Sequence, residues 1–325
     1  MSRILRIGGA CLNQIPMDWD HNLKNIKDVF QEAQENNIEL LCLPELCITG
    51  YGCEDMFLST WLCETAQAKL IELLPFTSGL TTSLGLPVRF EGQIYNCIAI
   101  IKDKKILGVY AKHNLANDGI HYEKRWFSSW PYHKIETLNI TGQSVQIGAI
   151  SLEIKNIKIG FEICEDAWQE DRPANHLVTQ GIEIILNPSA SHFAFEKEKY
   201  REQLVVSSSK KFNCTYLYTN LLGNEAGRMI YDGDILIAQN GNLIGHNTRF
   251  SFKPFNILYC EVDFDRQTSS TNLKKDYTGK LEEMSQALPL ALFDYLIKSK
   301  NKGFVLSLSG GADSSTIAIM VRRMV

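Results

Sequence analysis

The sequence has no long apolar run, no excess of positive charge and no regularly spaced cysteines. No stretch approaches the roughly 18 consecutive apolar residues of a membrane-spanning helix, and the start, MSRILRIGGACLN, lacks the apolar core of a secretory signal. Lysine and arginine number 33 against 37 acidic residues, so the formal net charge is −4 and no basic surface is expected. We therefore expect a cytoplasmic protein with neither nucleic acid nor a membrane as a partner.

The 9 cysteines are scattered, without CxxC pairs or histidine-rich neighbours. An odd number of cysteines in a chain without a secretory signal is typical of reduced thiols and not of a disulfide framework. Because no pair has the spacing of zinc ligands, a structural metal site is not expected. The thiols are candidates for core packing or for catalysis.

Apolar residues make up 45% of the chain, which is enough for a full core. Apolar runs predict strands at residues 4–10, 38–43, 83–88, 94–101, 105–110, 145–152, 158–163, 182–186, 215–220, 235–238, 243–245 and 256–262. Helical spacing predicts helices at residues 19–36, 55–74, 174–180 and 196–211. This alternation is typical of a layered α/β domain whose sites lie on loops at strand ends.

The polar stretch 265–280 is interpreted as a linker between two parts of the chain. Before it lies a first domain, residues 1–264. After it, in residues 281–325, we expect a helix at 281–300, a strand at 303–307 and one further helix. Because a single strand and helix cannot bury an apolar face alone, we interpret the chain as a truncated form of a longer protein.

Cys164 follows an apolar run, in the segment IKIGFEICEDAW. A cysteine attacks an acyl carbon as the thiolate, and the acids that follow it, Glu165 and Asp166, would raise its pKa. A general base and a cation must therefore come from elsewhere in the chain. Glu45, after the run LLCLP, and Lys112, after the run ILGVYA, are candidates at other strand ends.

These residue types suit amide chemistry. Glu45 could take the thiol proton and pass it to a leaving amine, and Lys112 could stabilise the tetrahedral oxyanion with the backbone N–H of Glu165. Spacing alone leaves a plainer alternative open, in which Cys164 is a core residue and the two charged residues are solvated.

Four segments together resemble the nitrilase superfamily, whose members hydrolyse or transfer amides and nitriles: PELCITGYGCEDMF, YAKHNLANDGIHYEKRWF, FEICEDAW and NPSASHF. The resemblance implies catalytic roles for Glu45, Lys112 and Cys164, in this chain order. It adds Glu123 as a second, supporting glutamate beside the lysine. It also implies the superfamily's four-layer α-β-β-α sandwich, which agrees with the alternation of helices and strands.

The segment NPSASHFAFEKEKYR resembles the part of glutamine-using members that binds the amino-acid end of glutamine. The resemblance makes Ser191 a hydroxyl donor to glutamine and Lys197 a counter-charge for its α-carboxylate. The alternative for Lys197 is an ordinary charge on the following helix. Many relatives have a glutamine-contacting tyrosine where this sequence has Asp118, so that role is not carried over, and we interpret the change as a difference between branches.

The segment GFVLSLSGGADSSTIAIM has the pattern of a strand, a glycine turn and a helix. It lacks the GxxxxGK[ST] of a Walker A loop, but SGGADS resembles the PP-loop of ATP pyrophosphatases. Backbone N–H groups at such a turn and at the following helix N-terminus bind phosphate. The alternative is a turn without a ligand. The residues implied in binding ATP and pyrophosphate are Ser309, Gly310, Gly311, Asp313 and Ser314.

An amidase domain of this type followed by a PP-loop resembles the glutamine-dependent NAD synthetases. The resemblance implies that L-glutamine is hydrolysed without a cofactor or metal. It also implies that a second domain, with ATP and Mg²⁺, uses the ammonia to amidate nicotinic acid adenine dinucleotide, and that the protein is a homo-oligomer. We expect this chain to retain only the glutaminase half. Two alternatives remain open: a stand-alone carbon-nitrogen hydrolase acting on ω-amides or carbamoyl compounds, and a non-catalytic oligomerisation fragment.

Overall fold

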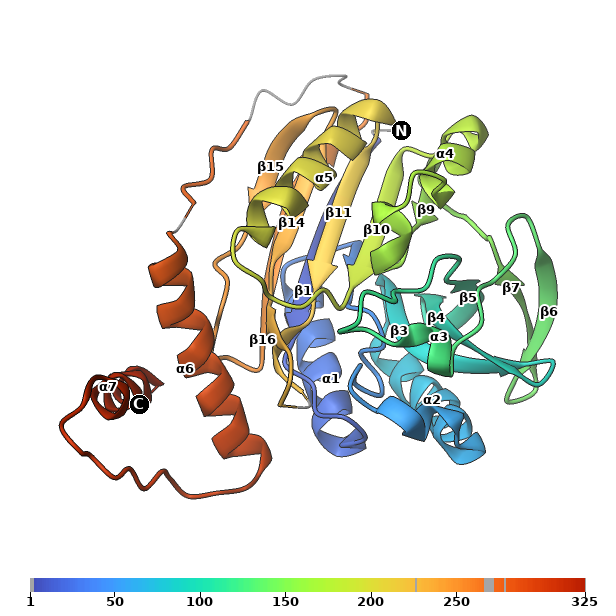
Figure 1. Ribbon diagram of the computed structural model, residues 1–325. Helices are drawn as coiled ribbons and strands as arrows, with labels where there is room; N and C mark the ends of the chain where they lie inside the picture. Colours follow the sequence, from blue (N-terminus) through green and yellow to red (C-terminus); the bar gives the residue numbers. More distant parts are fainter. Residues whose placement is uncertain (1–2, 226, 266–271, 278, 325) are drawn as a thin grey trace.

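The computed structural model describes residues 3–225, 227–265, 272–277 and 279–324. Two β-sheets are stacked face to face, and helices cover the outer face of each sheet (Figure 1). The expected α-β-β-α sandwich is therefore confirmed. Two further helices follow it along the chain.

Eight strands form the larger sheet: β1 (Ile4–Leu12), β2 (Leu40–Cys42), β3 (Thr81–Phe90), β4 (Gln93–Lys102), β5 (Lys105–Ala111), β6 (Ile135–Ile140), β7 (Gln143–Gly148) and β16 (Phe255–Asp263). Their order is β16-β1-β2-β3-β4-β5-β7-β6. β1, β2 and β3 are parallel, whereas β3, β4 and β5 are antiparallel neighbours. β5 therefore runs in the same direction as β2.

Six strands form the smaller sheet: β8 (Leu152–Ile154), β9 (Ile157–Phe161), β10 (Ile184–Ser189), β11 (Thr215–Asn220), β14 (Ile235–Gln239) and β15 (Asn242–His246). Their order is β15-β14-β11-β10-β9-β8, and β9, β10 and β11 are parallel. A separate antiparallel pair consists of β12 (Leu222–Asn224) and β13 (Ile230–Asp232).

The α-helices are α1 (Trp19–Glu35), α2 (Thr60–Leu73), α3 (Glu123–Trp126), α4 (Pro173–Leu177), α5 (Lys197–Lys211), α6 (Lys280–Lys298) and α7 (Ala312–Met324). Short 3-10 helices span Glu54–Leu58, Leu74–Phe76, Cys164–Trp168 and Val178–Gln180. α1 and α2 pack on the larger sheet, and α4 and α5 pack on the smaller one. Because apolar residues recur every three or four positions along α1, its buried face is continuous.

The core between the sheets explains why several strands are apolar throughout. Ile7 and Leu40 of the larger sheet and Phe161, Ile184 and Leu217 of the smaller sheet belong to one buried cluster. The central strands also pack against helices on their other face, so both sets of alternating side chains are buried.

Strand direction positions the predicted site residues. The carboxyl ends of β2 and β5 lie at one edge of the larger sheet, and those of β9 and β10 lie at one edge of the smaller sheet. Glu45 and Lys112 follow the first two strands, and Cys164 and Ser191 follow the other two. The topology thus brings four residues that are distant in the sequence to the ends of facing sheets.

One predicted strand is wrong. Residues 303–307 form neither helix nor strand, and most of residues 301–311 are exposed. An extended segment becomes a strand only when a neighbouring strand completes its backbone hydrogen bonds, and no described strand pairs with this one. The helix predicted after the glycine turn is present as α7.

Two other predictions need new boundaries. Residues 145–152 were expected to form one strand, but β7 ends at Gly148 in one sheet and β8 begins at Leu152 in the other. Gly148 has φ +133°, a conformation that favours glycine, where the chain leaves the first sheet. The helix expected at 55–74 begins as a separate 3-10 turn, and α2 starts at Thr60.

Much of the predicted linker, residues 266–271 and 278, lies outside the described residues. Its described part contacts the sandwich: Lys275 Nζ lies 2.8 Å from a carboxylate oxygen of Glu198 and 3.1 Å from one of Asp234. α6 then packs along the sandwich with Ala287 buried. No helix among the described residues is both long and apolar enough to cross a membrane.

Candidate active site

Three charged residues form a buried ionic cluster at the end of the larger sheet. Lys112 Nζ lies 2.6 Å from Oε1 of Glu45 and 2.8 Å from Oε2 of Glu123, and all three side chains are fully buried. Asn96 Nδ2 also donates to Oε1 of Glu45 at 2.7 Å, and the Tyr51 hydroxyl donates to Oε1 of Glu123 at 2.9 Å. The lysine is therefore fixed between two carboxylates that are themselves held in place.

Only one oxygen of Glu45 takes part in this cluster. Its Oε2 is buried and has no hydrogen-bond partner among the described residues. Burial raises the pKa of Glu45 to about 7, against the opposing effect of Lys112. Burial alone would lower the pKa of Lys112, but Glu123 and Glu45 raise it well above its usual value. At neutral pH the lysine is thus charged, while Glu45 is close to its titration midpoint and has a free oxygen.

Cys164 begins the 3-10 helix Cys164–Trp168 directly beyond β9 and has φ +43°. Asp166 fixes this turn: its carboxylate accepts from the backbone N–H of Ile163 at 2.9 Å and from that of Asn114 at 2.7 Å. The second bond ties the cysteine turn to the loop that follows Lys112. Burial, and next the charge of Glu45, raise the pKa of the Cys164 thiol, and Lys112 opposes them. The resting sulfur is therefore a thiol that needs a base.

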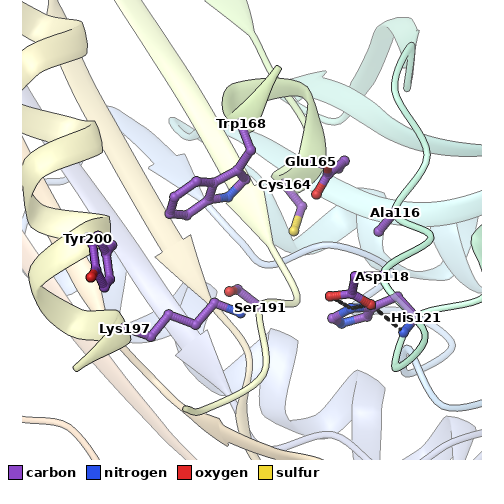
Figure 2. Close-up of a pocket in the computed structure, with 9 residues that line it drawn as sticks. All are labelled: Ala116, Asp118, His121, Cys164, Glu165, Trp168, Ser191, Lys197 and Tyr200. Carbon is purple, nitrogen blue, oxygen red and sulfur yellow. Dashed lines mark hydrogen bonds and ion pairs between the residues drawn. The ribbon is translucent and has the colours of Figure 1, made fainter. Parts of the chain in front are cut away.

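A cavity of about 340 Å³ opens beside this thiol, with Ser191 and Lys197 in its lining (Figure 2). Of the described cysteines, Cys164 alone lines it. Burial, followed by the charge of Arg201, lowers the pKa of Lys197 to about 8. The remaining lining residues are Ala116, Asp118, His121, Glu165, Trp168 and Tyr200.

Glu165, next to Cys164 in the same 3-10 helix, also lines the cavity. The backbone N–H of Asp166 donates to the carbonyl of Ile163. The side chain of Glu165 is half-buried and accepts from Gln169. That the N–H of Glu165 contacts the oxyanion stays a prediction.

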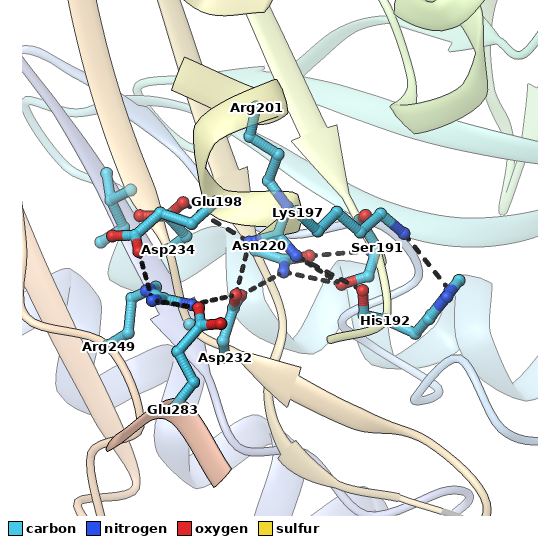
Figure 3. Close-up of polar contacts among 12 residues, drawn as sticks. Ser191, His192, Lys197, Glu198, Arg201, Asn220, Asp232, Asp234, Arg249 and Glu283 are labelled. Carbon is cyan, nitrogen blue, oxygen red and sulfur yellow. Dashed lines mark hydrogen bonds and ion pairs between the residues drawn. The ribbon is translucent and has the colours of Figure 1, made fainter. Parts of the chain in front are cut away.

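A buried polar network supports Ser191 (Figure 3). Asn220, at the end of β11, accepts from Ser191 N at 2.8 Å and donates to Ser191 O at 2.9 Å. Asn220 also donates to Asp232, which pairs with Arg201 at 2.5 Å. Arg249 joins the network through Asp232 at 3.2 Å. The loop that carries Ser191 is therefore fixed by a network whose groups come from four other segments.

The sequence did not predict Tyr51, Asn96, Asp166 or Asn220 as parts of the site. The available signal was weak but present for Asn96, which interrupts the apolar run of β4 and is fully buried. Such a buried amide needs hydrogen-bond partners, and here they are the carboxylates of Glu45 and Glu123.

The predicted phosphate loop lies elsewhere. It leads into α7, on the far side of α6 from the sandwich (Figure 1), and its residues do not line the cavity. Gly310 has φ +83°, and the Ser309 hydroxyl lies 3.1 Å from that of Ser314 and accepts from Gly311 N at 3.4 Å. Asp313, in the first turn of α7, is exposed.

The family of carbon-nitrogen hydrolases matches residues 7–270, which include the ionic cluster, the thiol and the cavity. The chain belongs to this family. Glutamine-dependent NAD(+) synthetase of Oryza sativa subsp. indica is 31% identical over 367 residues, covering 98% of this chain and 50% of that protein. The Homo sapiens protein of the same name is 31% identical over 373 residues, covering 100% and 53%. The chain spans about half the length of these curated relatives.

Solved structures give the same result. The crystal structure of a glutamine-dependent NAD(+) synthetase from Cytophaga hutchinsonii has a TM-score of 0.89 and 48% identity, covering 99% of this chain and 51% of that one. An amidase from Nesterenkonia sp. has a TM-score of 0.65 and 18% identity, covering 80% and 90%. The likeness to the amidase concerns the carbon-nitrogen hydrolase fold alone, and it covers most of this chain but not its whole length.

Proposed function

We propose that this chain hydrolyses the side-chain amide of L-glutamine, with Cys164 as the nucleophile. The observation that carries the proposal is the buried Lys112–Glu45–Glu123 cluster, whose charges act on Cys164. Of the described cysteines, Cys164 alone lines the cavity. A thiol whose pKa is raised needs a base within reach, and Glu45 has an unpartnered oxygen and a pKa of about 7.

The residues divide the reaction as follows. Glu45 takes the proton of Cys164 while Sγ attacks the amide carbon, and the carbonyl oxygen becomes an oxyanion near Lys112 and the N–H of Glu165. Glu45 returns the proton to the leaving nitrogen, the C–N bond breaks, and ammonia departs from a thioester. A water molecule then loses a proton to Glu45 and attacks the thioester carbon, which releases glutamate and the thiol.

Glu123 and the substrate loop have supporting roles in this proposal. Glu123 holds Lys112 in place and balances its charge. Ser191 and Lys197 bind the amino-acid end of glutamine, the lysine as a counter-charge for the carboxylate. This step requires neither a cofactor nor a metal ion, because the proton transfers and the oxyanion contacts are assigned to side chains and one backbone N–H.

The relatives named above suggest what the ammonia is for. In a longer protein that includes this chain, we infer that ammonia amidates nicotinic acid adenine dinucleotide to give NAD, with ATP and Mg²⁺. In this proposal residues 1–264 form the glutaminase domain, and residues 281–325 begin the ATP-binding domain. The longer protein is a homo-oligomer. Ser309, Gly310, Gly311, Asp313 and Ser314 bind phosphate at the N-terminus of α7.

Glutamate and ammonia release from glutamine tests the proposal, with a panel of other ω-amides and carbamoyl compounds alongside. Cys164→Ala should abolish turnover, and a glutamine-like diazoketone should label Cys164, as peptide mass mapping would show. Cys53→Ala, which removes a buried thiol outside the cavity, is the matched control and should retain turnover. Unchanged turnover by Cys164→Ala, or a preference for amides other than glutamine, would contradict the proposal. The chain alone is not expected to make NAD.

A further inference from the structure

Asp118 lies on the wall of the cavity opposite Ser191 and Lys197, with the thiol of Cys164 between the two walls (Figure 2). The side chain of Asp118 is 52% exposed. Its Oδ1 accepts from the backbone N–H of Ile120 at 3.1 Å and of His121 at 2.8 Å. These two bonds form a local turn that fixes the carboxylate at the cavity edge.

The ring of His121 holds the same carboxylate from the side. His121 Nδ1 lies 3.1 Å from Oδ1 and 3.2 Å from Oδ2 of Asp118. Burial works to raise the pKa of Asp118, but the bonds from His121 outweigh it and lower the pKa to about 2. Asp118 is therefore an anion at neutral pH, and its side chain lines the cavity.

The cavity thus presents an anion and a cation on opposite walls. Asp118 is close enough to Lys197 to contribute to the charge environment of the ammonium group. A ligand with one positive and one negative group at the same end would satisfy both walls at once. The head of a free α-amino acid has this arrangement, and a simple ω-amide does not.

We propose that Asp118 binds the α-ammonium group of the substrate while Lys197 receives its α-carboxylate, so that the cavity selects free α-amino acids with an ω-amide. The inference rests on the proposed function, which it deepens by adding the residue that distinguishes glutamine from its des-amino analogue.

A metal ion at Asp118 fits less well, and so does Glu165 as the partner of the ammonium group. Asp118, His121 and His192 could offer ligand atoms within 4.8 Å of one another to a metal ion, but the Lys197 ammonium lies 3.4 Å from Nδ1 of His192 and opposes a divalent cation. Glu165 is the other carboxylate of the cavity, but one of its oxygens already accepts from Gln169, and burial raises its pKa.

Asp118→Asn separates charge from geometry, because the amide oxygen can still accept both turn N–H groups. The probes are L-glutamine and 5-amino-5-oxopentanoate, which keeps the ω-amide and carboxylate but has no amino group. In Asp118→Asn, kcat/KM for glutamine should fall about 10- to 100-fold, mainly through KM, since a charge-assisted hydrogen bond is lost. The value for 5-amino-5-oxopentanoate should stay within about threefold.

Glu165→Gln is the comparison for the rival carboxylate, and Asp20→Asn, an exposed aspartate of α1, controls for net charge. Equal losses on both substrates in Asp118→Asn would mean a purely structural role and would overturn the inference. A selectivity change in Glu165→Gln but not in Asp118→Asn would overturn it as well. Asp20→Asn should leave both values unchanged.

Calorimetry of ligand binding to the Cys164→Ala protein tests the inference without relying on turnover. Cys164→Ala should bind glutamine more tightly than 5-amino-5-oxopentanoate, and the added Asp118→Asn change should remove that difference. If the unmodified chain does not hydrolyse glutamine but this binding pattern appears, the proposed function fails and the inference stands. Equal binding of the two probes by Cys164→Ala would overturn the inference whatever the activity.

Discussion

The hydroxyl of Tyr51 donates to Oε1 of Glu123 across 2.9 Å and links the loop after β2 to α3. Tyr51 is itself held by its backbone: Glu225 Oε2 accepts from the N–H groups of Tyr51 and Gly52, both at 2.7 Å. Burial raises the pKa of Glu225 to about 7. A continuous chain of contacts therefore runs from Glu225 through Tyr51 and Glu123 to Lys112.

Tyr51→Phe tests this chain of contacts. The ring stays, but Glu123 loses one of the hydrogen bonds that position it beside Lys112. A hydrogen bond to a charged group contributes about 1.5 kcal/mol, so kcat for glutamine should fall about tenfold while KM stays unchanged, because Tyr51 does not line the cavity. Steady-state kinetics measure both constants.

Tyr110→Phe is the matched control, because it removes the same atom from a buried tyrosine whose hydroxyl has no partner among the described residues. Its kcat should remain near that of the unmodified chain. A rise in KM for Tyr51→Phe without a change in kcat would mean that the tyrosine acts on substrate binding and not through Glu123.

Opposite charges act on the thiol of Cys164, so two variants should move its pKa in opposite directions. Burial is the largest cause of the raised pKa, Glu45 raises it further and Lys112 lowers it. Glu45→Gln should therefore shift the pH midpoint of Cys164 alkylation downward, and Lys112→Met should shift it upward. Peptide mass mapping after timed alkylation at a series of pH values gives both midpoints.

In these variants the rate of turnover should not change in parallel with the ease of forming the Cys164 thiolate. Glu45→Gln makes the thiolate easier to form but removes the base, so turnover should fall about 10²- to 10⁴-fold. Lys112→Met removes the ammonium assigned to the oxyanion, and turnover should fall about 10²- to 10³-fold. Midpoints that move in the same direction would show that the two charges do not act on Cys164 as a pair. Circular dichroism confirms that each variant is folded.

The raised pKa of Glu45 predicts how activity depends on pH. A base must be ionised, so kcat/KM for glutamine should rise about tenfold per pH unit toward pH 7 and then level off. The contribution of Glu45 to the free energy of unfolding changes with pH in the opposite direction, because it decreases as pH rises. The folded pKa is above the unfolded value of about 4.3, so the stabilisation is present below that value and is lost as pH rises through the folded pKa.

Kinetics between pH 5.5 and 8.5, with urea unfolding over the same range, measure both effects. Glu45→Gln should lack this contribution to the pH dependence of stability. A kcat/KM limb with its midpoint below pH 5.5 would mean that the free site does not raise the pKa of Glu45, or that another group is the base.

Local sequence pattern located the residues at strand ends, but their catalytic roles came from the family resemblance, because pattern alone left a core cysteine and solvated charges open. Glu45, Lys112 and Cys164 each follow an apolar run, and parallel strand direction decides that such positions meet. Pattern was insufficient for partners that face the site from the side. Asn220 is apparent only once β11 lies beside β10, and Asp166 only once its turn meets the loop after Lys112.

The error at residues 303–307 has a related cause. Its apolar residues fit a strand, but strand formation depends on a neighbour that no local pattern specifies. The same limit explains why Asp118 could not be assigned from the sequence: its role depends on which residues lie across the cavity, namely Ser191 and Lys197.

Asp232 contacts three residues of the buried network: Asn220, Arg201 and Arg249. Burial alone would raise its pKa, but Arg201 and Arg249 hold the pKa well below its usual range. Asp232→Asn leaves both guanidinium groups without their shared carboxylate, so the free energy of unfolding should fall by about 3–5 kcal/mol. KM for glutamine should also rise, because Asn220 then donates to a neutral amide oxygen in place of a carboxylate.

Urea unfolding of Asp232→Asn measures the stability loss, and Asp55→Asn is its control. Asp55 forms a bidentate pair with Arg125 on the surface, and solvent screening makes such a pair contribute little.

Because the folded pKa of Asp232 is lowered, its stabilisation is present above the ordinary carboxyl pKa of about 3.9 and is lost as pH falls through the folded value. The stability difference between Asp232→Asn and the unmodified chain should therefore be constant from pH 5 to 7 and shrink below pH 4. A difference that stays constant to pH 2 would show that the loss comes from altered packing and not from the missing charge.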